Sequence, residues 1–312
     1  MAPTFTAGHA DLAGGCHAWL QPDGGWGLSN AGLVSGRGES LLVDTLFDLR
    51  LTGRMLAGLA PVTADAPITT VVNTHGNGDH WFGNQLLAGS RLIASAATVE
   101  DMRAVGPAEV RALLAHPGSA GVVARRIFGA FHFGEVSPVL PETTFERELN
   151  LRVGGVEVQL TDVGPAHTAG DTIVHVPAAG VVYTGDIVFA GGTPIVWHGP
   201  IANWLRACDL IAALGATTIV PGHGPVTTTA AVRAQSAYLR FVQEEAALRH
   251  AKGMTFTEAA HDIDLGGYAA LPERERLIVN VHAVYRELDP ETPALDGPAV
   301  FACLGEFLED LL

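Results

Sequence analysis

The residues with the clearest chemical potential lie in a polar loop that follows an apolar segment. That segment, residues 68–73, is typical of a buried strand, and loops at strand ends commonly carry ligands. The loop reads Thr74-His75-Gly76-Asn77-Gly78-Asp79-His80. Imidazole and carboxylate groups bind zinc in proteins and can leave one coordination position for water. The loop therefore indicates a metal centre of the hydrolytic kind.

Three later segments, each at an expected strand end or turn, add further histidine and aspartate side chains. They contribute His167, Asp186 and His223. A single histidine beside glycine or proline is usually a hydrogen-bonded loop residue. Four histidines and two aspartates in this order form a far more specific pattern, and we interpret them as one metal centre.

The order and local context of these motifs resemble the metallo-β-lactamase superfamily over roughly residues 14–225. That family carries a His-x-His-x-Asp-His loop, a lone histidine, a bridging aspartate and a final histidine. By position, the resemblance implies a first metal at His75 and His167, a second at Asp79, His80 and His223, and Asp186 as the bridge. It also implies a hydrolase in which metal-bound hydroxide attacks the substrate, since a bound metal can lower the pKa of water toward ~7.

Asn77 stands where the family usually has a histidine. An amide oxygen is a poor, uncharged ligand for zinc, so we expect the first site to be the weaker one. The expected cofactor is therefore one or two zinc ions per chain, with the second site stronger. Asp79 is the expected catalytic residue as well as a ligand, because it would orient the attacking water.

A narrower resemblance concerns Gly24-Gly25-Trp26-Gly27-Leu28-Ser29-Asn30-Ala31-Gly32-Leu33 and Leu42-Val43-Asp44-Thr45. These stretches are similar to the cyclase/thioesterases of aromatic polyketide pathways, including the actinorhodin pathway. The resemblance implies hydrolysis of a thioester or ester, with release and cyclisation of an aromatic polyketide intermediate in antibiotic biosynthesis. The small-molecule substrate would then be bound to an acyl carrier protein.

Several other functions remain open on the same ligand set. A lactonase, a glyoxalase-type hydrolase or a hydrolytic dehalogenase would use these ligands with another pocket. His75, His167 and Asp186 would also make the two-histidine, one-carboxylate triad of an iron oxygenase. A degenerate metal-binding or ligand-binding module is the alternative outside the enzymes, and metal content after purification would separate it from a hydrolase.

Aromatic side chains near the metal motifs predict a pocket for a flat, apolar substrate. The expected lining residues are Trp81, Phe128, Phe131, Phe189, Trp197 and His198. For any one aromatic residue, packing in the core is the commoner fate. Arg125 and Arg126 offer a contact for a phosphopantetheine phosphate or an acidic carrier protein.

Composition and charge restrict the class of protein. The chain has 312 residues, of which 48% are hydrophobic and 16% charged, as in folded globular proteins. A net charge of −15 with Lys252 as the single lysine disfavours nucleic-acid binding. We see no secretory signal and no apolar run near the ~20 residues that span a bilayer, so we expect a cytoplasmic protein with no membrane contact. The three scattered cysteines are expected to be reduced thiols.

Alternating short strands and helices must hold these motifs in place. Predicted strands cover residues 32–34, 41–45, 68–73, 149–153, 156–160, 172–176, 181–184 and 217–220. Predicted helices cover residues 47–59, 207–214, 228–250 and 273–288, and residues 96–130 are mainly helical. The pattern favours an α/β fold, a layered sandwich in a single domain over residues 1–312, and the resemblance implies that the sandwich has four layers, αββα. A helical insertion at about 96–145 and a helical C-terminal extension at about 228–312 complete it.

Overall fold

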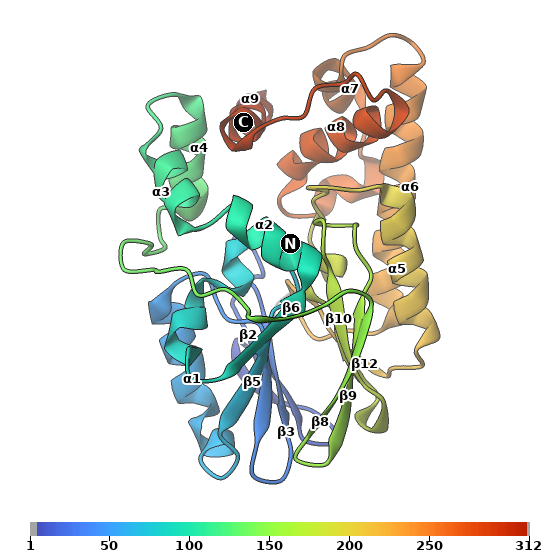
Figure 1. Cartoon of the computed structure of the whole chain (residues 1–312). Helices are drawn as coiled ribbons and strands as arrows, with labels where there is room; N and C mark the ends of the chain where they lie inside the picture. The colour runs from blue at the N-terminus through green and yellow to red at the C-terminus, as the bar shows by residue number, and fades with distance from the viewer. Residues whose placement is uncertain (1–4, 311–312) are drawn as a thin grey trace.

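Two stacked β-sheets with helices on both outer faces form the fold (Figure 1), in a computed structural model that describes residues 5–310. The first sheet has seven strands in chain order, β1 to β7, and the second has five in the order β12-β11-β10-β9-β8. Helix α1 covers the outer face of the first sheet, and α5 and α6 cover that of the second. This arrangement confirms the predicted αββα sandwich.

The first sheet is antiparallel at its beginning and parallel at its end. Strands β1 (Gly8–Asp11), β2 (Cys16–Leu20), β3 (Ala31–Ser35) and β4 (Ser40–Val43) pair antiparallel, and β5 (Ile68–Val72), β6 (Arg91–Ser95) and β7 (Thr143–Phe145) then add in parallel. Between β4 and β5 runs α1 (Leu49–Thr63), whose N-cap Asp48 accepts the Leu51 N–H. The helix buries Met55 and Leu59 against the sheet, because apolar residues recur along one of its faces.

The second sheet is antiparallel except at one edge. Its strands are β8 (Glu148–Val153), β9 (Val156–Asp162), β10 (Thr172–Val176), β11 (Val181–Tyr183) and β12 (Thr218–Val220), and only β11 and β12 run parallel. Helices α5 (Ile201–Ala213) and α6 (Thr229–His250) lie outside it. Between the two sheets, residues such as Val34, Val43, Val174 and Tyr183 form one hydrophobic core.

The remaining helices gather at the end of the sheets where β6 runs into α2 (Figure 1). The insertion contributes α2 (Ala96–Ala104), α3 (Pro107–Ala115) and α4 (Ser119–Phe128), and the C-terminal extension contributes α7 (Phe256–Asp262), α8 (Leu277–Leu288) and α9 (Gly297–Asp310). Helix α9 packs on α4, where the rings of Phe128 and Phe301 lie 5.6 Å apart. Insertion and extension therefore support each other above the carboxyl ends of the parallel strands.

Some element boundaries differ from the sequence prediction. Helix α5 begins at Ile201 after the N-cap Pro200, six residues before the predicted start at 207. The helix predicted for residues 273–288 begins at Leu277, because Glu273 has a φ of 58° and only a 3₁₀ turn, η6 (Arg274–Arg276), connects the two. Strands β1, β2, β6 and β7 were not predicted, and helices α7 and α9 lie within the helical extension predicted for about 228–312, for which no separate bounds were given.

Two further expectations concern the cysteines and the membrane. Cys16 and Cys208 are buried, Cys303 is partly buried, and all three are free thiols, as predicted. Within residues 5–310, none of the helices combines the length and the hydropathy that crossing a bilayer requires.

Candidate metal centre

Each histidine or aspartate of the motifs sits where a strand meets a loop. The loop after β5 carries His75, Asp79 and His80, with the last two in the short 3₁₀ helix η1 (Gly78–His80). Asp186 follows β11 in η4 (Gly185–Ile187), and His223 follows β12. Because β5, β11 and β12 end at the same edge of the sandwich, side chains distant in sequence come together there.

Local backbone contacts hold two of these loops in position. The Asp171 carboxylate accepts the N–H groups of Ala166 and Thr168, both at 3.1 Å, and so fixes the turn that presents His167. At the end of β12, a Cβ on Gly222 would overlap the Asp186 carboxylate. The position beside the bridging aspartate therefore requires glycine.

The structure brings all six residues together in the two groups that the sequence analysis assigned. One group is His75, His167 and Asp186, the other is Asp79, His80 and His223, and in each the ligand atoms lie within 4.8 Å of one another.

Asp186 faces both groups. Its Oδ1 lies 3.1 Å from His80 Nε2, and its Oδ2 lies 3.4 Å from both His167 Nε2 and His223 Nε2. His75 Nε2 is 3.8 Å from the same Oδ2. A single carboxylate in this position can contact two cations, one in each group.

All four imidazoles turn Nε2 toward the centre and use Nδ1 for an outer partner. His167 Nδ1 contacts the Ile195 carbonyl at 2.8 Å, and His223 Nδ1 contacts the Gly24 carbonyl at 3.1 Å. The Nδ1 atoms of His75 and His80 meet side chains, as described next. Outer partners of this kind fix the tautomer and ring orientation of metal-binding histidines.

Asp44 is the outer partner that the two ligands from the β5 loop share. Its Oδ2 lies 2.9 Å from His80 Nδ1 and accepts the Thr74 hydroxyl at 2.7 Å. That hydroxyl is 3.0 Å from His75 Nδ1, so Asp44 reaches His75 through Thr74. Sequence analysis missed this role, although the Val43-Asp44-Thr45 stretch was part of the narrower resemblance.

Buried atoms without partners show that the site suits a cation. His75 Nε2, His80 Nε2 and Asp186 Oδ1 are buried and make no hydrogen bond within the described chain. An unsatisfied buried polar group costs ~1–3 kcal/mol, more if it is charged. A divalent cation would satisfy all three, and imidazole nitrogens with carboxylate oxygens are the donors that zinc prefers.

The two groups differ in electrostatics. Burial works to lower the pKa of His80, but the carboxylates of Asp186, Asp79 and Asp44 outweigh it and hold that pKa well above its ordinary value. For His223, burial is likewise outweighed by Asp186 and Asp79, which raise its pKa to about 9. In the other group burial prevails and lowers the pKa of His167 to about 4. The carboxylates thus act most strongly on the histidines of the second group, which are protonated in the metal-free chain.

Asn77 faces the first group. Its Oδ1 lies 2.7 Å from His167 Nε2, the atom that a cation in this group would contact. The contact must break or rearrange before His167 can bind a metal. The contact between Asn77 and His167 therefore competes with a cation at the first group.

An aromatic cavity opens directly over the metal groups. It is lined by Trp26, Gly27, Phe47, Asn77, Asp79, Phe128, Asp186, Phe189, Ile195, Trp197, His223 and Arg276. Three residues predicted for a pocket are therefore in place: Phe128, Phe189 and Trp197. Asn77, Asp79, Asp186 and His223 form its floor.

The other three pocket predictions are corrected by the structure. Trp81 is fully buried in the core beneath the loop, where its indole N–H donates to the Gly76 carbonyl at 2.9 Å. Phe131 packs behind the wall, with its ring 4.9 Å from that of Phe47. His198 is exposed and does not line the cavity, because the chain turns outward after Trp197.

Five lining residues escaped prediction, and besides Gly27 and Ile195 they are the two aromatic residues Trp26 and Phe47 and the cation Arg276. Trp26 belongs to the Gly-rich stretch of the narrower resemblance, which gave a signal that was not used for the pocket. Phe47 begins a predicted helix, and nothing in the sequence around it indicated that it lines a pocket. Arg276 lies in η6, far from every motif, and only the folded C-terminal extension brings it to the cavity.

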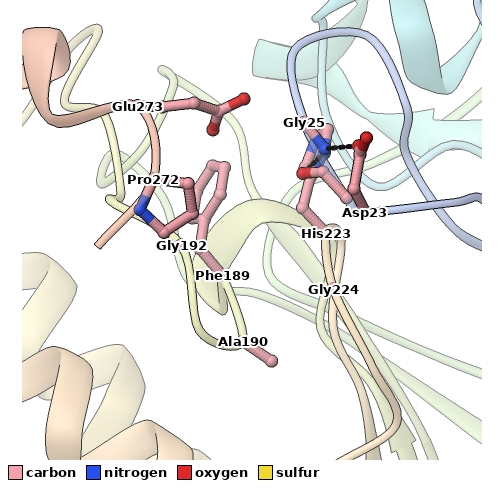
Figure 2. Close-up of a pocket in the computed structure, with 10 residues that line it drawn as sticks. Asp23, Gly25, Phe189, Ala190, Gly192, His223, Gly224, Pro272 and Glu273 are labelled. Carbon is pink, nitrogen blue, oxygen red and sulfur yellow. Dashed lines mark hydrogen bonds between the residues drawn. The ribbon is translucent and has the colours of Figure 1, made fainter. Parts of the chain in front are cut away.

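A second cavity of about 240 Å³ adjoins the first behind Phe189 (Figure 2). Asp23, Gly24, Pro272 and Glu273 are among its lining residues, and both cavities share Phe189 and His223. The Phe189 ring stacks on the His223 imidazole, with centroids 5.2 Å apart and planes 6° from parallel. Phe189 thus belongs to the walls of both cavities, and its ring packs on His223, one of the candidate metal ligands.

Comparisons with known proteins agree with this geometry. The family model described as "Metallo-beta-lactamase superfamily" matches residues 24–223. A search of curated proteins gives no match.

Solved structures show the same fold at low sequence identity. The sec-alkylsulfatase Pisa1 from Pseudomonas sp. is 19% identical with a TM-score of 0.66, over 90% of this chain and 50% of that one. A metallo-beta-lactamase from Pontibacter korlensis is 17% identical with a TM-score of 0.54, over 75% of this chain and 99% of that one. The chain thus spans about half the length of the alkylsulfatase, and the similarity to it includes regions outside the part shared with the lactamase.

Proposed function

Since this chain belongs to the metallo-beta-lactamase superfamily, we propose that it is a zinc-dependent hydrolase of aromatic thioesters or esters. The main support for the proposal is that the aromatic wall of the cavity lies next to the candidate metal groups. Trp26 lies with its ring 6.1 Å from Phe128, nearly edge-on, and 6.3 Å from Trp197. Rings at these distances pack against one another and form one continuous aromatic wall, and a fused-ring substrate would stack on the side of that wall that faces the cavity.

The candidate ligand residues at the floor of the cavity would bind zinc in two groups. The second group, Asp79, His80 and His223, would hold the tighter zinc ion, and His75 and His167 the weaker one, with Asp186 between them. Bound there, zinc would supply a Lewis acid for the substrate carbonyl and activate water at neutral pH.

Asp79 is the proposed catalytic carboxylate. Its Oδ2 lies 3.3 Å from His223 Nε2, and the residue lines the cavity. Burial works to raise the pKa of Asp79, but the positive charge of His80 and His223 outweighs it and lowers that pKa. Asp79 therefore stays ionised and can orient a water molecule by accepting a hydrogen bond from it.

The aromatic wall limits water to the floor. Phe189 is buried, and Trp26, Phe128 and Trp197 are each partly buried by one another and by the helices above. A bound flat substrate would complete this enclosure, which strengthens the electrostatic contacts at the reacting carbonyl.

The finer proposal is release and cyclisation of an aromatic polyketide intermediate from an acyl carrier protein. Arg126 is exposed near the end of α4, two residues before the wall residue Phe128. Arg125 donates to the carbonyls of Leu114 and His116 and so closes the turn between α3 and α4. Arg126 is therefore the better contact for an acidic carrier. The three free cysteines favour a reducing compartment, so a cytoplasmic location is part of the proposal.

Sulfate-ester hydrolysis is the second candidate. The structural similarity to the sec-alkylsulfatase extends over 90% of this chain, which includes helices outside the region that the family model matches. At 19% identity this similarity concerns the fold, so the candidate is tested beside the first.

The test is a panel of substrates with zinc-loaded protein: aryl thioesters, penicillins, simple lactones, halogenated aromatics and secondary alkyl sulfates. We expect aryl thioesters to have a kcat/KM at least about tenfold above penicillins and lactones, since burying one aromatic ring contributes ~1.5–3 kcal/mol and about 1.4 kcal/mol is tenfold in rate. Preference for small aliphatic lactones would overturn the aromatic proposal, and preference for alkyl sulfates would establish the second candidate.

Two variants control the panel. Trp197→Ala removes part of the wall, whereas His198→Ala changes the exposed neighbour that does not line the cavity. Only the first variant should lose the preference for aryl thioesters. Equal losses in both would mean that the wall does not contact the substrate.

A further inference from the structure

Arg276 is a buried cation in the wall of the metal cavity. Its side chain is only 2% exposed, and it lines the same cavity as Asp79, Asp186 and His223. Within residues 5–310, it is the one lysine or arginine among the residues lining either cavity. A cation in this place is unusual for a chain with a net charge of −15.

Part of the hydrogen-bonding capacity of Arg276 is used within the chain. Nη2 forms an ion pair with Glu273 Oε2 at 2.7 Å, and Nη1 donates to the Thr193 carbonyl at 2.7 Å. Nε is buried and has no hydrogen-bond partner. A guanidinium has more N–H donors than these contacts use, and a buried donor left unpaired is costly.

Aromatic rings restrict where a partner could approach. The guanidinium carbon lies 4.1 Å from the centroid of the Trp26 ring and 5.3 Å from that of Phe189. Trp26 thus covers one face of the guanidinium plane, and hydrogen bonds from guanidinium lie within that plane. A planar anion such as a carboxylate would therefore be bound at the edge of the guanidinium group, in its plane.

The same segment also fixes Trp26. Glu273 Oε1 accepts the Trp26 backbone N–H at 2.7 Å, and Glu275 Oε1 accepts its indole N–H at 2.9 Å. A ring that stacks on Trp26 is therefore held at a defined place relative to Arg276. The flat ring of a substrate and the charged group on that ring would therefore bind at the same time, the ring on Trp26 and the charged group at Arg276.

We propose that Arg276 binds an anionic group, of the carboxylate or sulfate class, on the aromatic part of the substrate. The proposal rests on the hydrolase function above, because it assumes that the reacting ester lies over the metal groups while the anionic group lies at Arg276. The substrate class is thus an aryl ester or thioester that carries a second, non-reacting anion.

Binding measurements test this without turnover. Zinc-loaded protein is titrated calorimetrically with 2-naphthoate, 2-naphthyl sulfate and the neutral 2-naphthamide. We expect one of the anions to bind at least about tenfold more tightly than the amide, the usual worth of a charge-assisted hydrogen bond. The tighter anion identifies the group that Arg276 recognises. No preference for either anion would overturn the proposal.

Variants separate Arg276 from the zinc ions, which also attract anions. Glu273→Gln/Arg276→Gln removes both partners of the buried ion pair, so that no unpaired charge stays behind. Arg274→Gln is the control, because Arg274 lies in the same turn, has the same charge and lines neither cavity, and its loss leaves the Glu273–Arg276 ion pair intact. We expect the preference for the anion to fall to about twofold in the first variant and to persist in the second.

A conservative variant of Arg276 separates the effect of its charge from that of its planar shape. Arg276→Lys keeps the charge but loses the planar fork, and it should show an intermediate preference even if the double variant unfolds. Equal preference in wild type, Arg276→Lys and the double variant, at equal zinc content, would overturn the role of Arg276. Hydrolysis of neutral aryl thioesters by the double variant would then leave the hydrolase proposal standing on its own.

Discussion

Asp44 Oδ2 lies 2.9 Å from His80 Nδ1, at the end of β4 and outside the ligand set. Asp44 is 2% exposed and has a φ of 63°, in the left-handed region. Burial is the largest influence on this carboxyl and raises its pKa, although His80 acts in the opposite direction. A strained and buried residue that holds two ligands is a positioning residue for the metal.

Asp44→Asn should weaken zinc binding by about 10–100-fold, the usual effect of losing an outer partner of a metal-bound histidine. Asparagine tolerates a positive φ, so the backbone is expected to persist. Zinc titration checks the affinity, and circular dichroism checks the fold. Unchanged affinity would mean that Thr74 and the loop suffice to orient His75 and His80.

Asp186→Ala should remove zinc from both groups, because Asp186 is the residue that faces all four histidines. The fold should largely survive, since removing a ligand opens the metal shell without emptying the core. His80→Ala should act on the second group in the same way. Metal analysis and hydrolysis of an aryl thioester check both variants, and wild-type turnover by metal-free Asp186→Ala would refute the mechanism.

Asn77→His should tighten zinc binding at the first group, because an imidazole replaces a weak amide ligand beside His167. In a titration, the second equivalent of zinc should bind more tightly, and the first should be little changed. Asn77→Ala is the control, as it removes the contact with His167 Nε2 without adding a ligand. A titration identical to wild type would show that position 77 does not reach the metals.

Zinc uptake should release protons at neutral pH. In the metal-free chain the pKa of His223 is about 9, so its imidazole is protonated at pH 7. Zinc binds the neutral ring, and binding therefore expels that proton. Affinity should rise as the pH increases from 7 toward about 9, and above that pH proton release should fall as the His223 imidazole becomes neutral, while His80, whose pKa is also raised, still contributes to it. Calorimetry in buffers of different ionisation enthalpy measures this, and buffer-independent heats at pH 7 would contradict it.

The metal motifs were predictable from sequence because each ligand lies within a few residues of a strand end that the hydrophobic pattern marks. His75, Asp79 and His80 share one loop, and glycines flank His167 and His223 closely. The cavity was less predictable. Trp81 is adjacent to a ligand in sequence yet points into the core, since successive residues of a short 3₁₀ turn face different directions.

Contacts between residues far apart in the chain explain why the other lining residues were not predicted. Arg276 and Glu273 reach the cavity only because the C-terminal extension folds back onto the loop that carries Trp26. No local pattern near residue 276 records a partner that lies about 250 positions away in the chain. Phe128 was predictable as an aromatic of the insertion, but its support by Phe301 depends on α9, which was not predicted.

The loop of residues 24–26 contacts both a candidate metal ligand and the aromatic wall of the cavity. Its Gly24 carbonyl holds the His223 ring at 3.1 Å, and its Trp26 indole forms the wall where a substrate ring would stack. A compound that immobilises Trp26 also immobilises the outer partner of a metal ligand. Thermodynamic reciprocity then requires that any factor by which an aromatic ligand tightens zinc is the factor by which zinc tightens that ligand. For the proposed zinc hydrolase, zinc availability would thereby set how strongly an aromatic substrate is retained, as well as how fast it is converted.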